Sequence, residues 1–391
     1  MIRSAAGRRS VFYDPKIRGI AVQIVTIGIL VGLILWIVHN TIANLQRSHI
    51  ASGFGFLGSR AGFDISQSLI PYSMEATYAR AFLVGLLNTL LVGGVGIVLA
   101  SIIGFILGIA RLSKNWLIAK IAAVYVETLR NIPVLLQLMF WYKAVLTVLP
   151  GPRQALFLPL GANLSNRGLL LPRPILGDGF YLTPLAFLAS LAVALLIAAW
   201  ARRRQMATGQ QFPSFRVGLL IVVVATAAVF IATGRPLDFD FPQLKGFNFL
   251  GGFNVSPELL ALVFGLVLYT ATYIGEIVRA GILAVSHGQT EAAYSLGLRA
   301  GPTLRLVVIP QALRVIIPPL TSQYLNLIKN SSLAVAIGYP DLVSVFAGTV
   351  LNQTGQAVEA IFITMAVYLA ISLVTSLAMN IFNRRVALVE R

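Results

Sequence analysis

The sequence has no cysteine and only three histidines, and just 11% of its 391 residues are charged. The missing cysteines exclude disulfides, thiol catalysis and cysteine-ligated zinc or iron–sulfur sites. His39, His49 and His287 are too far apart in the sequence to form a local metal-binding motif. A soluble domain carries about 25% charged residues, so the shortage of charge excludes an ordinary globular enzyme.

The rest of the composition is apolar and basic. Hydrophobic residues make up 57% of the chain, and 30 Lys and Arg outnumber 13 Asp and Glu, which gives a formal net charge of +17. The basic residues stand in short clusters between long apolar runs, which is typical of membrane proteins rather than of nucleic-acid-binding proteins. We therefore expect membrane lipid as a partner and no nucleic acid.

The apolar runs predict an all-α integral membrane protein, because lipid cannot satisfy open backbone groups. Each crossing needs about 20 apolar residues. The first run is too long for a signal peptide and lacks a small-residue cleavage site, so we expect a retained helix. Eight spans are predicted, at Gly19–Val38, Phe82–Ala110, Leu117–Leu149, Tyr181–Ala201, Val217–Thr233, Leu259–Val285, Pro318–Ile337 and Ala360–Asn383.

Lys and Arg predict the orientation. Most of them fall in segments on the same side as both termini, so both termini are expected in the cytoplasm. Pro150–Gly179 and Arg235–Pro257, rich in Gly, Pro, Asn and Asp, are expected to be external loops. They flank the fourth and fifth spans, a hairpin that resembles an insertion and has Arg202, Arg203 and Arg204 at its tip.

The segment Ser286–Pro310 is too polar to span and lies on the predicted cytoplasmic side. Ser286 followed by Gln289 is a capping-box pattern that predicts a helix start, and Gly297 is suited to end that helix in a left-handed conformation. Pro302 is tolerated in the first turn of a second short helix. The segment is either a helix–turn–helix that another surface approaches closely or an ordinary amphipathic loop.

This segment resembles the EAA loop of ABC importer permeases through Glu291, Ala292, Ala293, Gly297 and Pro310. Val307 and Ile309 stand where that motif usually has Ile and Leu. Further segments resemble the polar amino-acid permease subfamily, namely Leu87–Leu90, Glu127–Pro133, Tyr273–Gly281 and Lys329–Ala334.

The resemblance implies a five-span permease core in residues 82–149 and 257–385, with 286–310 as a cytoplasmic coupling loop. The remaining parts are a cytoplasmic N-terminus, an extra span and an insertion, in residues 1–18, 19–38 and 150–256. A core extended in this way is similar to the larger permease subunit of general L-amino-acid importers.

Permeases of this kind are transport subunits rather than enzymes, and the chain has no G-x-x-x-x-G-K-[ST] loop for a nucleotide. The resemblance implies that the chain binds no cofactor and that partner ATPase subunits bind ATP and Mg²⁺. The implied partners in the bacterial inner membrane are a second homologous permease, two ATPase subunits and a periplasmic amino-acid-binding protein. Closure of the ATPase dimer would push Glu291–Gly297 and switch the spans between inward- and outward-open states.

Ionisable groups inside spans are costly and usually face a cavity or a partner. Glu276 and Arg279, three residues apart on one helix face, are expected to form a structural ion pair. Glu127 and Arg130 have the same spacing, and both a packing role and a place in the substrate path remain open for them. Pro133 removes a helix hydrogen bond just beyond them, which leaves carbonyls able to face a substrate.

A polar group lies near the middle of the seventh predicted span and consists of Lys329, Asn330, Ser331 and Ser332. These residues either hydrogen-bond neighbouring helices or line a path with Glu127. In the second case Lys329, Asn330 and the serine hydroxyls would donate to the carboxylate of an amino acid, and Glu127 or backbone carbonyls would accept from its ammonium.

An ion-gradient-driven secondary amino-acid transporter is the alternative function. We find no pair of interrupted spans at matching positions in two halves, and such a transporter would leave the EAA-like loop without a role. A channel lacks a filter-like Gly/Thr run or charged ring, and a membrane enzyme lacks a catalytic cluster. Residues alone leave homodimer and heterodimer open, and the resemblance implies the heterodimer.

Overall fold

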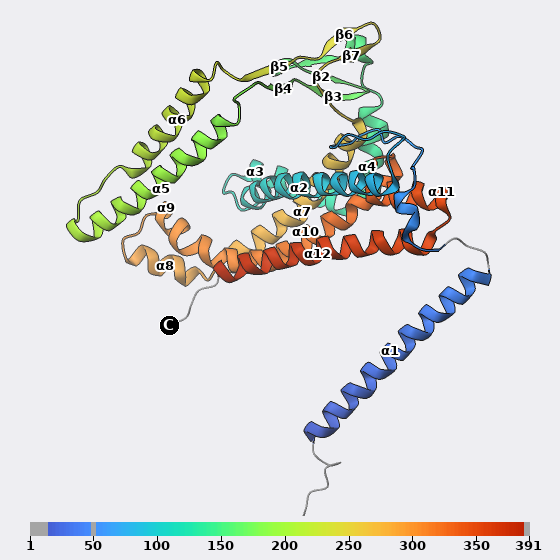
Figure 1. The fold of residues 1–391 in the computed structure, drawn as a ribbon. Coiled ribbons are helices and arrows are strands. Elements are labelled where there is room, and N and C mark those ends of the chain that lie inside the picture. The colour runs from blue at the N-terminus through green and yellow to red at the C-terminus, as the bar shows by residue number, and fades with distance from the viewer. Residues whose placement is uncertain (1–14, 48–51, 387–391) are drawn as a thin grey trace, which may run out of the picture. The chain divides into compact units, whose positions relative to one another are not determined.

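The computed structural model describes residues 15–47 and 52–386 (Figure 1). The chain divides into two compact units, one of Met1–Leu90 with Pro340–Ala378 and one of Leu91–Tyr339 with Met379–Arg391. Most of the predicted cytoplasmic N-terminus, residues 1–18, and the last five residues of the chain lie outside the described ranges.

The protein is mostly helical, as the sequence predicts. The long helices are α1 (Pro15–Arg47), α2 (Tyr78–Ala110), α3 (Trp116–Asn131), α5 (Leu182–Thr208), α6 (Ser214–Ala232), α7 (Pro257–Leu283), α10 (Ile309–Asn330) and α12 (Ala357–Val386). The short helices are α4 (Val134–Met139), α8 (His287–Ser295), α9 (Ala300–Thr303) and α11 (Leu351–Thr354). Helical turns of other pitch are π-helical at Phe140–Leu146, Leu304–Val308 and Val343–Val350, and 3₁₀-helical at Phe54–Gly58, Pro152–Gln154, Pro159–Gly161 and Ser331–Ile337.

The predicted third span is broken. Within the described residues, 7 helices are long and apolar enough to cross a membrane, or up to 8 if α3 and the helix that follows it count as one bent span. The bend is 103° and falls at Ile132 and Pro133. Proline cannot donate to the preceding turn, so the chain leaves helical geometry there instead of running straight from 117 to 149.

The helix that contains the seventh predicted span begins well before Pro318. Helix α10 begins at Ile309, and Pro318 and Pro319 lie inside it rather than at its start. Pro310 occupies the first turn, where a missing amide costs nothing. Lys329 and Asn330 are the last residues of α10, and Ser331 begins the 3₁₀ segment that continues the helical run to Ile337.

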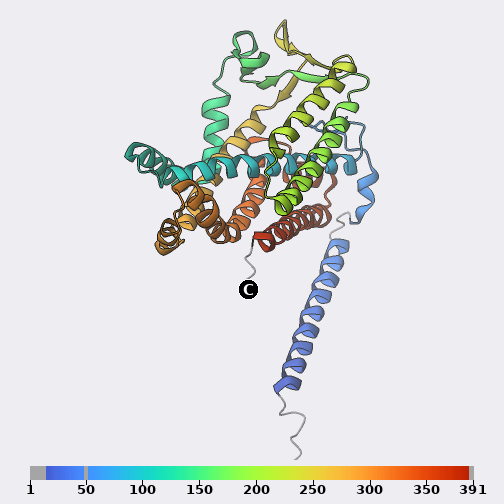
Figure 2. The ribbon, with the colours of Figure 1, turned by 90° about the vertical axis from the view of Figure 1, so that its left-hand side faces the viewer.

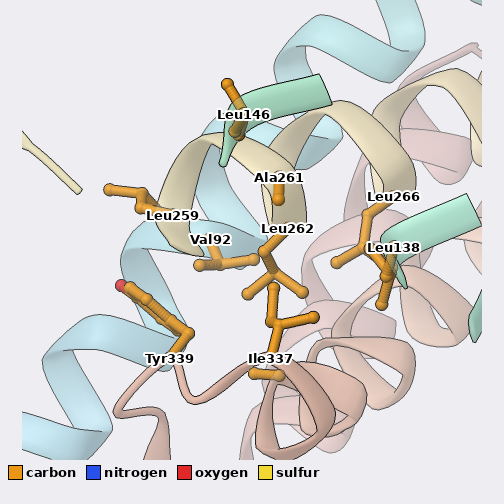
Figure 3. Packing of buried hydrophobic residues seen from close by; sticks show 10 residues of the cluster. Val92, Leu138, Leu146, Leu259, Ala261, Leu262, Leu266, Ile337 and Tyr339 are labelled. Atoms are coloured by element: carbon orange, nitrogen blue, oxygen red, sulfur yellow. The ribbon is translucent and has the colours of Figure 1, made fainter. Parts of the chain in front are cut away.

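Helix α7 organises the core of the second unit. Its Leu262 and Leu266 pack with Val92, Leu138 and Tyr339 in a buried apolar cluster (Figure 3). A second cluster further along α7 joins it to α2 and α10 through buried aliphatic side chains. Helices α3, α4 and α10 all pack against α7.

Two glycines bring α2 and α7 into very close contact. Gly104 and Gly108 form a G-x-x-x-G pair, the pattern that lets helix backbones approach in membranes. A Cβ added at Gly104 would lie 2.5 Å from Ile274, and one added at Gly108 would lie 2.7 Å from the carbonyl oxygen of Gly275. Any side chain at these positions would therefore force the helices apart.

The first unit has its own core around the π-helical segment Val343–Val350. Phe346 is fully buried and packs edge-on against Phe82, with ring centroids 5.3 Å apart. Phe56, Tyr78 and Ala360 complete this cluster.

The predicted external loops contain short strands. Four of them form an antiparallel sheet in the order β1 (Leu156–Leu158), β2 (Ala162–Ser165), β3 (Gly168–Leu171) and β8 (Phe253–Val255). Two antiparallel pairs adjoin it, β4 (Arg173–Leu176) with β5 (Leu237–Asp240), and β6 (Gln243–Lys245) with β7 (Asn248–Leu250). Strands of three or four residues are too short for alternation to be visible in the sequence, so Gly and Pro dominate the pattern there.

The inserted hairpin consists of α5 and α6, which run side by side in both views (Figures 1 and 2). Its helices are consistent with the fourth and fifth predicted spans. Only 6% of the most apolar window of each helix is buried. Their apolar surface is thus left to lipid or to another chain.

Candidate functional site

The predicted coupling loop forms two short helices, α8 and α9, as the sequence predicts. Helix α8 begins after Ser286, but the predicted side-chain cap is wrong because the Ser286 hydroxyl makes no capping bond. Its carbonyl accepts from the Gln289 amide at 3.0 Å instead. The side chain of Gln289 accepts from Gln311 Nε2 at 3.1 Å, which ties α8 to the first turns of α10.

Gly297 ends α8 in the predicted left-handed conformation, with φ of 77°. The Gly297 amide donates to the Tyr294 carbonyl at 2.8 Å, and the Leu298 amide donates to the Ala293 carbonyl at 3.1 Å. These two bonds are the pair of a Schellman motif, which requires a left-handed residue at this point. A Cβ at Gly297 would meet nothing within 4 Å, so the requirement is conformational rather than steric.

Two large side chains at the end of α8 are uncovered. Leu296 is 82% exposed and Tyr294 51% exposed. Glu291 and Ala292 are also exposed, whereas Ala293 is buried. Tyr294 lies in the last turn of α8 and Leu296 just beyond it, so both side chains are open to contact.

Glu276 forms an ion cluster with two arginines. Its Oε1 accepts from Arg279 Nη2 at 2.6 Å and from Arg279 Nε at 3.0 Å. Its Oε2 accepts from Arg111 Nη1, which lies just beyond the end of α2. The close approach of Gly108 to α7 brings Arg111 within reach of this carboxylate.

Glu127 and Arg130 do not pair with each other. Both are exposed on α3, and the described residues contain no ion pair between them. The Arg130 guanidinium instead lies 5.1 Å from the ring centroid of Tyr273 on α7, a cation–π contact. Tyr273 in turn shares a hydrogen bond of 3.0 Å with Tyr269.

The carbonyls freed by Pro133 are not available to a substrate, so that expectation is wrong. Gln137 is buried, and its Nε2 donates to the carbonyl of Leu129 at 2.7 Å and to that of Ile132 at 2.9 Å. The Leu129 carbonyl is the acceptor that an amide at position 133 would have used in a continuous helix. The side chain of Gln137 therefore replaces the amide that proline lacks.

The polar group at the end of α10 is split between buried and exposed residues. Ser331 is fully buried and donates to the Ile328 carbonyl at 2.7 Å. Ser332 donates to the Lys329 carbonyl at the same distance. Lys329 is exposed and Asn330 is half-buried. No hydrogen bond joins the side chains of Glu127 and Asn330 anywhere in the described residues.

The first unit holds a buried acid that the sequence analysis missed. Asp341 is fully buried and accepts from the Ser344 amide at 2.8 Å and from the Tyr368 hydroxyl at 3.1 Å. Burial raises the pKa of its carboxyl from 3.8 to about 7, and these hydrogen bonds offset the shift only in part. Its signal in the sequence is that it is the only acid between Glu291 and Glu359.

Comparison with known proteins defines the class of the chain. A family model described as the binding-protein-dependent transport system inner membrane component matches residues 200–388. The chain is 56% identical to the general L-amino acid transport system permease protein AapQ of Rhizobium johnstonii, over 98% of this chain and 96% of that protein. It is 54% identical to the putative amino-acid ABC transporter permease protein YhdX of Escherichia coli, over 97% of both chains.

A third relative is the glutamate/glutamine/aspartate/asparagine transport system permease protein BztB of Rhodobacter capsulatus, with 42% identity over 97% of this chain and 96% of that protein. These similarities define a membrane-spanning permease subunit of an ABC importer, in which separate partner subunits hydrolyse ATP. The chain belongs to the amino-acid permease family of binding-protein-dependent transport systems. Nothing in the comparisons favours the ion-gradient-driven alternative.

Proposed function

We propose that the chain is the larger permease subunit of a general importer of L-amino acids in the bacterial inner membrane. One observation carries this proposal. The similarity to AapQ extends over 98% of the chain and so includes the extra N-terminal span and the inserted hairpin. Shorter permeases, such as the probable glutamine permease GlnM of Bacillus subtilis, match only 31% of the chain.

In this proposal the chain pairs with a second, homologous permease, and two ATPase subunits that bind ATP and Mg²⁺ dock on the cytoplasmic face. A periplasmic binding protein delivers the amino acid to the opposite face, where the sheets of residues 150–256 lie. Both termini and the loop 286–310 are cytoplasmic. Single cysteines at Gln210 and Gly246, placed in the cysteine-free chain, test this orientation by impermeant maleimide labelling of intact cells, since only Gly246 should react.

The surface made by Glu291, Ala292, Tyr294 and Leu296 is the proposed contact with the ATPase. Its exposed apolar side chains and the Schellman turn at Gly297 support this assignment. The hydrogen bond between the side chains of Gln289 and Gln311 connects α8 to α10. A displacement of α8 would therefore act directly on α10. Residues 257–285 and 309–337 thus belong to the part of the core that switches between inward- and outward-open states.

The proposed substrate path involves Glu127 and Arg130 on α3 and the group Lys329, Asn330, Ser331 and Ser332 at the end of α10. Among them, Glu127, Arg130 and Lys329 are exposed and have no ion-pair partner in the described residues. A charged group without a partner inside a span is costly, and a zwitterionic substrate supplies both missing charges.

The test is uptake of radiolabelled L-amino acids by proteoliposomes that contain the complete transporter and binding protein. We expect uptake to require ATP on the side of the proteoliposome membrane that carries the ATPase subunits. Ionophores, which collapse ion gradients, should not affect uptake. Uptake driven by an imposed ion gradient without ATP would contradict the proposal.

A further inference from the structure

The inserted hairpin has a groove that the import cycle proposed above does not use. The groove runs along α5 and α6 and has a volume of about 460 Å³. Its lining is almost entirely apolar and includes the small residues Ala194, Ala198 and Gly218. At Gly218 the two helices are so close that an added Cβ would lie 3.1 Å from the Cβ of Ala194.

The groove is as long as one leaflet of a bilayer is thick. Leu191 lines one end and Arg202 the other, eleven residues apart on α5. At about 1.5 Å per residue the groove is about 16 Å long. This is roughly half of the hydrocarbon core, which is about 30 Å thick. An acyl chain that fills the groove would therefore have its head group at the end of the groove lined by Arg202.

Several hydrogen-bond donors converge on the polar end of the groove. Arg202 and Ser214 line it there. Ser214 is the first residue of α6, and the amides of Phe215 and Arg216 in its first turn have no acceptor among the described residues. The start of a helix favours anions because its free amides and dipole point at them.

The positive charge at this end is uncompensated. Arg202 has no ion-pair partner in the described part of the chain, and no Asp or Glu occurs between Asp178 and Asp238. The hairpin thus offers donors for a phosphate and no carboxylate for an ammonium group.

Aromatic residues at the tip of the hairpin predict that it lies at the membrane surface. Trp200 and Phe212 pack edge to face with ring centroids 5.5 Å apart. The guanidinium of Arg204 lies 5.5 Å from the Trp200 ring and donates to Gln210 at 2.9 Å. Trp residues flanked by Arg are typical anchors at the level of the lipid head groups. Arg202 is two residues from Trp200 and lies at the same level.

We propose that this groove is a binding site for an anionic phospholipid. The acyl chain lies along Leu191, Ala194, Ala198 and Gly218, and the phosphodiester binds Arg202 and the first turn of α6. The apolar length of the groove selects a lipid rather than a free phosphate. The hairpin carries basic residues and no acid at this end, so it attracts an anionic head group more strongly than one whose ammonium balances its phosphate.

The experiment is native mass spectrometry of the intact purified transporter titrated with phosphatidylglycerol or with phosphatidylethanolamine. We expect the wild type to retain phosphatidylglycerol in preference. Arg202→Gln should weaken phosphatidylglycerol binding by roughly tenfold or more, the effect of losing a charge-assisted hydrogen bond. Arg203→Gln is the matched control, since it removes the same charge one residue away from the groove, and its binding should stay close to that of the wild type.

Two further variants separate the groove from its charge. Arg202→Lys keeps the charge and should retain most of the phosphatidylglycerol binding that Arg202→Gln loses. This result would show that the loss in Arg202→Gln does not come from poor assembly of the transporter. Ala198→Phe fills the groove and should weaken binding of both lipids. Equal losses for Arg202→Gln and Arg203→Gln, or a wild type that binds both lipids equally, would overturn the proposal and leave only diffuse attraction to a basic tip.

Discussion

The side-chain amide of Gln137 lies 2.7 Å from the carbonyl oxygen of Leu129. This bond closes the gap that Pro133 opens in the backbone of the broken span. The backbone carbonyls at the break between α3 and α4 therefore have a hydrogen-bond donor. Such a donor is needed in lipid, where water cannot replace a missing one.

Replacing Gln137 with Leu should destabilise the assembled transporter. The carbonyls of Leu129 and Ile132 would lose their donor, at a cost of roughly 1–3 kcal/mol. Thermal melting of the purified complex measures this loss. Gln211→Leu is the control, because Gln211 is exposed and makes no side-chain hydrogen bond among the described residues. Equal melting of the two variants would contradict the role assigned to Gln137.

Glu276→Gln should be more harmful than Arg279→Gln. Without the carboxylate, Arg111 and Arg279 face each other unpaired, whereas loss of Arg279 leaves Glu276 paired with Arg111. We expect a loss of roughly 1–3 kcal/mol for Glu276→Gln, measured by melting of the complex. Glu75→Gln is the control, since its 3.6 Å pair with Arg60 is highly exposed and pairs of that kind contribute little. A larger effect of Arg279→Gln would disprove the shared-carboxylate account.

Gly297→Asp should abolish transport-coupled ATP hydrolysis while the complex still assembles. The substitution places a side chain at a left-handed φ and a carboxylate on the surface proposed to meet the ATPase. Gly301→Asp adds the same charge at a nearby position of ordinary backbone conformation with open space around it, and should retain more activity. ATPase activity with and without loaded binding protein is the measurement. Normal coupling of ATP hydrolysis to transport in Gly297→Asp would show that this loop is not the contact with the ATPase.

Asn330→Ala should weaken uptake by roughly tenfold or more if Asn330 contacts the amino acid, at about 1.4 kcal/mol per decade. Concentration-dependent uptake per assembled transporter measures this. Asn326→Ala, about one turn earlier on α10 and exposed, is the control. A lower melting temperature with unchanged uptake would assign Asn330 to helix packing alone.

Asp341 should make stability depend on pH. Its pKa is about 7 in the folded protein against 3.8 as a free group, so between these values the folded state holds a proton that the unfolded state has released. The free energy of unfolding therefore falls as pH rises through this window, by at most about 1.4 kcal/mol per pH unit.

The measurement is melting temperature against pH for Asp341→Asn. Relative to the wild type, this variant should gain stability between pH 5 and pH 8. Asp178→Asn, at an exposed position, should follow the wild type. A constant difference between Asp341→Asn and the wild type across this range would show that the carboxyl is already ionised at pH 5.

Long-range apolar patterning and turn chemistry predict much of this protein. The spans follow from hydropathy, and the turn at Gly297 follows from the need for a left-handed residue at a helix end. The start of α10 does not follow from its prolines, because prolines usually mark helix ends, whereas Pro318 and Pro319 lie within a helix that packs on α7.

The tertiary contacts of the candidate site could not be predicted in the same way. Whether Glu276 meets Arg111 depends on how closely α2 approaches α7, which two glycines decide. Gln137 satisfies the carbonyls near Pro133 only because the chain bends by 103° there. Neither the ion pair of Glu276 with Arg111 nor the hydrogen bonds of Gln137 can be predicted from local residue spacing.

The helical run from Ala300 to Ile337 has a mechanical consequence. It is 38 residues long, which corresponds to more than about 50 Å at roughly 1.5 Å per residue, well beyond the about 30 Å of the hydrocarbon core. A run of this length crosses the bilayer at a tilt or extends beyond it, and its Ala300 end follows α8 in the chain. Because Ala300–Ile337 is helical throughout, a displacement of its Ala300 end would be passed along the helix axis toward Ile337 with no coil segment to absorb it.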